Sequence, residues 1–236
     1  MTVIKKIINK IKYWASIIVA QIKNMSSLSD KGERVDIRYK NGINTDIFDI
    51  YQKSHYQRYQ YALQNIKEGD IVADLACGTG YGSVMLSQKA ASVLGVDINP
   101  RVINKIKRIY KKMPNVSFLS ADLLKISYEQ EFDDIISFET IEHFEEKDIQ
   151  KLFFIFYKAL KPGGQLVFST PFIQEKSEQA VKMGFHKTFY IDENKIKEWL
   201  NQSGFKSFSF RYQNYKTHEV LESLDEKDFI ICIAKK

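Results

Sequence analysis

The sequence predicts an α/β fold in which a doubly wound, mainly parallel sheet of seven strands carries helices on both faces. Three observations support this fold class. Apolar runs of strand length alternate with amphipathic helical stretches, a glycine-rich turn follows the first run, and two strand-like segments close the chain. Because no strong helical pattern separates the closing segments, we expect them to form an antiparallel hairpin at one edge of the sheet.

Strands and helices are predicted to alternate from residue 51 onward. The strands are expected at residues 71–75, 92–96, 116–119, 132–138, 165–170, 205–212 and 229–234. Helices are expected at residues 51–66, 100–112, 147–160 and 193–203, with a further one near Val84. Asp192 and Gly204 have the residue types of an N-cap and a C-cap for the last helix. Ligands are expected at the carboxyl ends of the parallel strands.

The composition is ordinary for a globular protein, and its excess positive charge is confined to one end. Of the 236 residues, 44% are hydrophobic and 27% are charged. The net charge is +6, but residues 1–29 hold five lysines and no acid, so the rest of the chain is nearly neutral. This distribution argues against a nucleic-acid partner for the main domain. Cys77 and Cys232 form neither a disulfide framework nor a metal-binding pair, which favours a cytoplasmic protein with reduced thiols.

Residues 1–25 predict a basic amphipathic helix, and residues 26–50 predict a linker or lid ahead of a main domain at residues 51–236. Isoleucines and Trp14 recur at spacings of three and four between residues 3 and 22, with lysines on the other face. The uncharged run is too short to span a bilayer. Two interpretations stay open: the helix binds a partner or the inner face of a membrane, or it covers an edge of the main domain.

The stretch from Ile71 to Gly82 predicts a nucleotide-type binding site. A buried strand is followed by glycines at positions 78, 80 and 82 and then by the start of a helix. This arrangement brings backbone N–H groups close to a ligand at a helix N-terminus. Asp97 ends the next strand 19 residues after Gly78, where its carboxylate can accept both hydrogen bonds of a ribose diol. Three features argue against a dinucleotide: Ser83 replaces the last glycine of the G-x-G-x-x-G pattern, an acid lies inside the first strand, and a hairpin closes the sheet.

Several motifs, in a fixed order, resemble those of the class I S-adenosylmethionine-dependent methyltransferases, whose fold is Rossmann-like. The resemblance covers about residues 55–235. The motifs are Val-Ala-Asp-Leu-Ala-Cys-Gly-Thr-Gly from residue 72, Gly-Val-Asp97, Ser-Ala-Asp122, Glu139 to His143, and Leu-Lys-Pro-Gly-Gly-Gln-Leu-Val-Phe-Ser-Thr from residue 160. The resemblance implies that S-adenosylmethionine is the methyl donor.

The resemblance also implies which residues contact the cofactor. Asp74 and the backbone near Gly78 and Gly80 would hold the methionine part. Asp97 would bind the ribose hydroxyls, and Asp122 would bind the adenine amino group unless it only caps a helix. The predicted cofactor-binding residues are Arg58, Asp74, Ala76, Gly78, Gly80, Asp97, Ile98, Asp122, Leu123 and Phe138.

A Glu139-x-x-Glu142-His143 segment follows the fourth predicted strand. Its spacing puts three ligand-type side chains on one side of a turn, and His186 is the available fourth ligand for a divalent cation such as Mg²⁺. The pattern resembles the metal site of small-RNA 3′-terminal 2′-O-methyltransferases and a segment of ubiquinone-biosynthesis O-methyltransferases. Two alternatives stay open. His143 or His186 acts as a metal-free general base, or the glutamates only complement the dipole of the following helix. The predicted catalytic residues are His143, His186 and Glu139.

Together these features predict O-methylation of a hydroxylated small molecule, a sugar or glycan, or a lipid-linked acceptor by in-line displacement. Ser137-Phe-Glu-Thr stands where enzymes that methylate adenine or cytosine amino groups carry Asp/Asn-Pro-Pro-aromatic, which disfavours that reaction. Two alternatives are an RNA 3′-terminal ribose 2′-O-methyltransferase and an idle, S-adenosylmethionine-binding scaffold recruited to membranes through residues 1–23.

Overall fold

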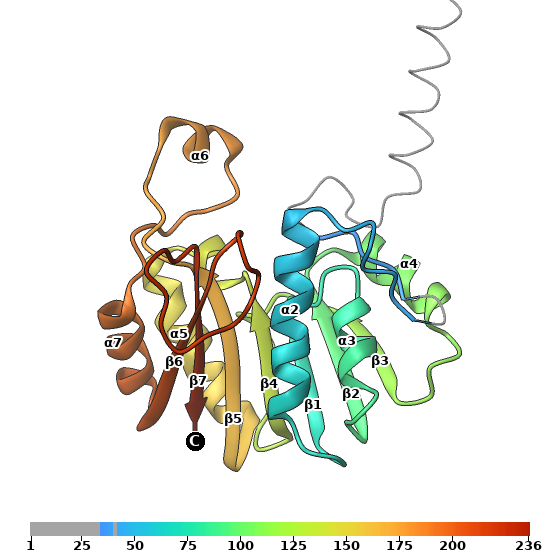
Figure 1. The fold of residues 1–236 in the computed structure, drawn as a ribbon. Helices are drawn as coiled ribbons and strands as arrows, with labels where there is room; N and C mark the ends of the chain where they lie inside the picture. The colour runs from blue at the N-terminus through green and yellow to red at the C-terminus, as the bar shows by residue number, and fades with distance from the viewer. Residues whose placement is uncertain (1–33, 40–41) are drawn as a thin grey trace, which may run out of the picture.

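The computed structural model describes residues 34–39 and 42–236, whose strands form a seven-stranded sheet (Figure 1). The strand order is β3-β2-β1-β4-β5-β7-β6, and β7 runs antiparallel to both of its neighbours. The strands are β1 (Ile71–Leu75), β2 (Ser92–Asp97), β3 (Val116–Ser120), β4 (Phe132–Phe138), β5 (Leu160–Pro171), β6 (Ser207–Gln213) and β7 (Phe229–Lys235). The helices are α2 (Ile50–Asn65), α3 (Tyr81–Leu86), α4 (Pro100–Ile109), η1 (Ile141–His143), α5 (Glu146–Ala159), α6 (Glu178–Met183) and α7 (Glu193–Ser203). The predicted fold class and closing hairpin are confirmed, whereas the helix predicted at residues 1–25 lies outside the described residues.

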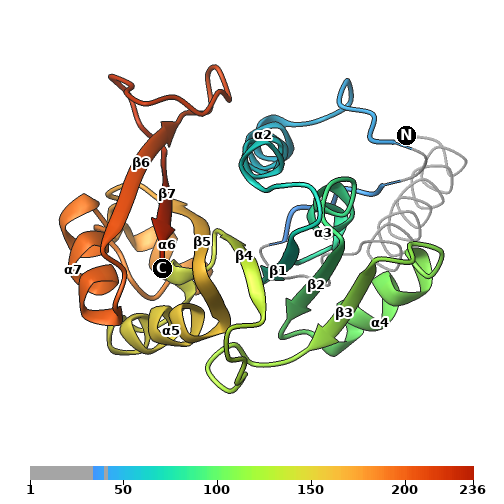
Figure 2. The same ribbon diagram turned by 90° about the horizontal axis from the view of Figure 1, so that it is seen from below.

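Both faces of the sheet carry helices because alternate strand residues point to opposite sides. Ala73 and Ile135 belong to the hydrophobic core that α5 and α7 cover. Val72 and Ile136, their neighbours in the chain, belong to the core under α2 and α3. Figure 2 shows these two pairs of helices on opposite sides of the sheet. In the described part of the chain, each helix falls short of the length and apolar character that a membrane-spanning helix needs.

Strand β5 begins earlier than the sequence predicts. Helix α5 ends at Ala159, as the Lys-Pro-Gly-Gly stretch indicates, but residues 161–164 continue as extended chain beside β4. A Cβ on Gly164 would lie 2.7 Å from the carbonyl oxygen of Asp133, so only glycine fits at this crossing. Residues 161–164 therefore form an irregularity in the β4–β5 pairing.

Residues 172–191, the excursion, leave the sheet after β5 and return before α7. Two backbone hydrogen bonds close its neck: Ile173 N–H donates to the Ile191 carbonyl at 2.9 Å, and Tyr190 N–H donates to the Gln174 carbonyl at 3.0 Å. Figure 1 shows the excursion projecting beyond the edge at which β4 ends. It contains α6, which the sequence analysis did not predict because a six-residue helix is too short to display a helical period.

Candidate active site

β1 leads directly into the glycine loop, residues 76–80, which ends where α3 begins. Gly78 and Gly80 have φ angles of 53° and 73°, which glycine adopts at little cost. Gly82 has a different role, because a Cβ there would lie 2.1 Å from the ring of Tyr59. The third glycine is therefore required by the close packing of α2 on α3 and not by a ligand.

Asp74 lies beneath the glycine loop and is fully buried. The hydroxyl of Tyr59 donates to its Oδ1 at 2.9 Å, and the hydroxyl of Ser83 donates to its Oδ2 at 2.6 Å. Burial raises the pKa of the Asp74 carboxyl to about 6, and the two hydrogen bonds oppose this rise. The sequence predicts a contact with the methionine part of the cofactor. In the structure the carboxylate contacts the hydroxyls of Tyr59 and Ser83, and the contact with the cofactor stays a prediction. Ala76, the first residue of the loop, has a φ of 67°.

The raised pKa of Asp74 predicts that stability falls as pH rises from about 4 to about 7. In this window the folded protein keeps the proton up to a pKa of about 6, whereas the unfolded chain releases it near 3.8. The unfolded state therefore binds fewer protons, and the free energy of unfolding decreases with pH by up to roughly 3 kcal/mol from this group. In Asp74→Asn, which does not titrate, the decrease between pH 4.5 and pH 7 measured by urea unfolding should be smaller by about 2 kcal/mol, because roughly 1 kcal/mol of the effect already falls below pH 4.5. Ser83→Ala keeps the carboxylate and removes a hydrogen bond that lowers its pKa, so the decrease should persist or grow. Equal pH slopes for wild type and Asp74→Asn would contradict the assignment.

Asp97 ends β2 beside the glycine loop. Gly78 N–H donates to its Oδ2 at 3.2 Å, and Asn99 N–H donates to its Oδ1 at 2.8 Å. Arg34 forms a two-pronged ion pair with the same carboxylate. Ile98, one of the predicted cofactor-binding residues, follows directly and is 65% exposed. Sequence reasoning missed Arg34 because it lies in a polar segment without a helical or strand pattern.

Asp122 lies just after the end of β3, the strand that neighbours β2. Its Oδ1 accepts the N–H of Leu124 at 3.0 Å, and Lys125 lies 3.5 Å from its Oδ2. Leu123 is buried in the core that α5 and α7 cover. The structure therefore brings Asp97 and Asp122 to the carboxyl ends of adjacent strands, with Asp122 already engaged in a local turn.

Arg58 extends from α2 towards the end of β4 and is 2% exposed. Its Nη1 donates to the Gln213 side chain at 2.7 Å, and its Nη2 lies 3.8 Å from the Glu139 carboxylate. Glu139, with a φ of 49°, also accepts a hydrogen bond from the Ser169 hydroxyl at 2.7 Å. Phe138 is buried and packs edge-on against Tyr59. Arg58 and Glu139 thus form a charged pair at the end of β4.

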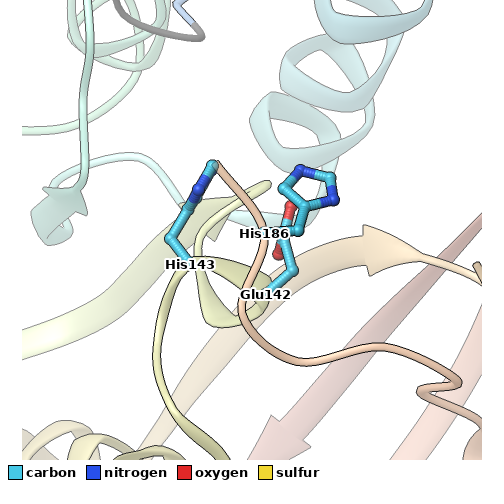
Figure 3. Close-up of side chains that lie close together, drawn as sticks. All are labelled: Glu142, His143 and His186. Carbon is cyan, nitrogen blue, oxygen red and sulfur yellow. The ribbon is translucent and has the colours of Figure 1, made fainter. Parts of the chain in front are cut away.

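A separate group of side chains, the histidine cluster, consists of Glu142, His143 and His186. Their ligand atoms lie within 4.8 Å of one another. Figure 3 shows that the first two come from the turn after β4 and that His186 comes from the excursion. The N–H groups of Lys187 and Thr188 donate to the carbonyl of Glu142 at 2.8 and 3.1 Å, which fixes the excursion beside η1. Three of the four predicted metal ligands are therefore brought together, whereas the Glu139 carboxylate is directed towards Arg58.

Hydrogen bonds to carbonyl oxygens orient both imidazoles of this cluster. Nδ1 of His143 lies 3.0 Å from the Phe185 carbonyl oxygen, and Nδ1 of His186 lies 2.5 Å from the Gln174 side-chain oxygen. Because these oxygens can only accept, each neutral ring carries its proton on Nδ1 and its lone pair on Nε2. Such Nδ1 bonds are typical of histidines that serve as ligands or bases through Nε2. Glu142 is held by the Thr170 hydroxyl, which donates to its Oε2 at 2.9 Å.

A sheet of this order, with β7 antiparallel and a glycine loop followed by an acid at the end of β2, defines the fold of the class I S-adenosylmethionine-dependent methyltransferases. Residues 72–164 match a family model described as a methyltransferase domain, which places such a domain in this part of the chain.

Individual relatives share this domain but differ in their reactions. The chain is 32% identical over 140 residues to a malonyl-[acyl-carrier protein] O-methyltransferase of Priestia megaterium, covering 56% of this chain and 49% of the relative. It is 35% identical over 108 residues to phosphoethanolamine N-methyltransferase 1 of Arabidopsis thaliana, covering 44% of this chain and 22% of that protein. The match thus spans about half of the first of these relatives and less than a quarter of the second. The N-methyltransferase NodS of Bradyrhizobium japonicum, solved with S-adenosylhomocysteine, superposes with a TM-score of 0.60 at 18% identity, covering 81% of this chain and 89% of that one.

Proposed function

We propose that this protein transfers the methyl group of S-adenosylmethionine to a hydroxyl oxygen of a small hydroxylated molecule, a sugar or a lipid-linked glycan. The observation that carries the proposal is the group of Glu142, His143 and His186 beside the end of β4. Methyl transfer from a sulfonium is an in-line displacement, and a neutral hydroxyl is a weak nucleophile. A site with two oriented imidazoles suits an acceptor that must lose a proton as it attacks.

The roles of the residues follow from their positions. The glycine loop and Asp97 would hold the donor, with Asp97 accepting hydrogen bonds from the ribose hydroxyls. Nε2 of His143 or His186 would take the proton of the attacking hydroxyl. The Arg58–Glu139 pair would border the donor and the acceptor, with Arg58 offered to a carboxylate of the cofactor.

A divalent cation would fit the histidine cluster, but with three ligands instead of the four that the sequence predicts. One carboxylate and two imidazoles suit a transition-metal ion better than Mg²⁺, which prefers oxygen ligands. Glu142, His143 and His186 would hold it, and when bound it would lower the pKa of an acceptor hydroxyl. Without it, the same histidines remain candidates for the base.

The test is a turnover screen with methyl-labelled S-adenosylmethionine over hydroxylated glycans, quinols, amines and short RNAs, with and without EDTA. We expect label in an O-methyl product and stoichiometric S-adenosylhomocysteine. Label only in amine or RNA products would replace the proposed acceptor class, and no turnover with any acceptor would favour the scaffold. Activity that survives EDTA would rule out the proposed metal. If EDTA abolishes activity, its recovery with Mn²⁺ or Zn²⁺ but not with Mg²⁺ would support a site of one carboxylate and two imidazoles.

A further inference from the structure

Residues 34–39, the strap, lie against the glycine loop. The hydroxyl of Thr79, inside the loop, donates to the Val35 carbonyl at 2.9 Å. Ile37 is 2% exposed and belongs to the core under α2 and α3. The Gln52 side chain of α2 donates to a strap carbonyl at 2.8 Å. The strap is therefore held in a defined position over the predicted cofactor site.

Arg34, the first strap residue, engages Asp97 through two nitrogens. Its Nη2 lies 2.9 Å from Oδ1 and its Nε lies 3.2 Å from Oδ2. The Asp97 oxygens also accept the N–H groups of Gly78 and Asn99. An ionised carboxylate has about four acceptor sites, so these four donors fill it. The side chains of Arg34 and Asp97 are only 17% and 6% exposed, which limits screening of the pair by water.

A ribose diol presents two hydroxyl donors to a carboxylate with the same two-pronged geometry. The N–H groups of Gly78 and Asn99 belong to the loops that shape the site, so the Arg34 guanidinium is the donor that must leave. The Arg34 methylene carbons lie 3.8 to 4.0 Å from the position that a Cβ of Gly78 would take. They therefore cover the glycine-loop backbone that would face the cofactor.

We propose that Arg34 competes with the cofactor ribose for Asp97, and that the Arg34 side chain covers Asp97 until it leaves and the ribose takes its place, while the rest of the strap stays anchored. This inference rests on the proposed function, because it takes Asp97 as the ribose-binding residue. Only the fraction of molecules with Arg34 displaced binds the cofactor, so the apparent dissociation constant is the intrinsic one divided by that fraction.

The test compares S-adenosylhomocysteine binding to wild type, Arg34→Met and Arg38→Met by titration calorimetry and stopped flow. Arg34→Met keeps a long side chain without the charge and should bind at least about tenfold more tightly, because the competing ion pair is absent. The observed association rate should level off at high ligand concentration for wild type and rise linearly for Arg34→Met. Arg38 pairs with Asp36 within the strap, so Arg38→Met removes one charge without touching Asp97 and should behave as wild type.

Arg34→Lys is the second variant, since lysine keeps the charge but lacks the planar fork. Its affinity should lie between those of wild type and Arg34→Met. Equal or weaker binding by Arg34→Met would overturn the competition while leaving the proposed function intact, provided that wild type binds. If neither wild type nor any variant binds, the ribose assignment and the proposed function fail together.

Discussion

Asp97→Ala should weaken S-adenosylhomocysteine binding about 100-fold. The carboxylate is expected to accept both ribose hydroxyls, and hydrogen bonds to a charged group contribute roughly 1.5–3 kcal/mol each. Loss of both therefore corresponds to at least about two powers of ten in the dissociation constant. The loop would also lose the acceptor for Gly78 N–H, which adds to the effect. Calorimetric titration of the folded variant measures the loss directly.

The control for this variant is Asp192→Ala, which removes the N-cap carboxylate of α7. It should cost about 1 kcal/mol of unfolding free energy and leave cofactor affinity unchanged. Because Asp97→Ala also releases Arg34, the Arg34→Met/Asp97→Ala double variant compared with Arg34→Met isolates the ribose contribution. Affinity of the double variant within threefold of that of Arg34→Met would disprove the ribose assignment.

His143→Ala should lower kcat by about 10²- to 10⁴-fold, the range for loss of a general base or of an imidazole that orients the acceptor. Its affinity for S-adenosylhomocysteine should not change, because Glu142, His143 and His186 lie beyond β4 and the donor loop follows β1. Single-turnover kinetics with the acceptor found in the screen, together with calorimetry of the product cofactor, separate the two effects.

His218→Ala provides the matched control. His218 contacts the Ser54 hydroxyl through Nδ1 at 2.9 Å and belongs to the chain between β6 and β7. Its loss should leave kcat nearly unchanged. If His143→Ala and His186→Ala each retain half of the wild-type kcat, the histidine cluster does not serve the reaction, and Glu139 becomes the residue to test.

The sequence predicts the sheet well because its strands carry separate apolar runs and its caps are local. Helix α7 begins after Asp192 and ends before Gly204 as predicted, since both caps act through bonds within a few residues. Helix α4 ends three residues early, at Ile109, because Tyr110 turns into the core beside Phe118. That packing is a long-range contact, which a local pattern does not encode.

The candidate site is predictable to the extent that its residues follow strand ends. Asp97 ends its strand, and Asp122 and Glu142 follow theirs, so their neighbourhood can be inferred from topology. The directions of the side chains cannot. Glu139 and Glu142 are three residues apart, yet one faces Arg58 and the other faces the histidines, because the positive φ of Glu139 interrupts the turn. The Arg34–Asp97 pair joins residues 63 positions apart and has no sequence signature.

The neck of the excursion has a consequence for how such enzymes diversify. Because two backbone hydrogen bonds close residues 173–191 at their base, the chain enters and leaves the sheet edge at nearly the same point. Insertions or exchanges between the two ends would alter what surrounds His186 without shifting β5 or α7. The proposed donor-binding residues on β1 to β3 would thus be separable from the exchangeable segment. Under the proposed function, grafting an excursion from a relative with a different acceptor should redirect the methyl group.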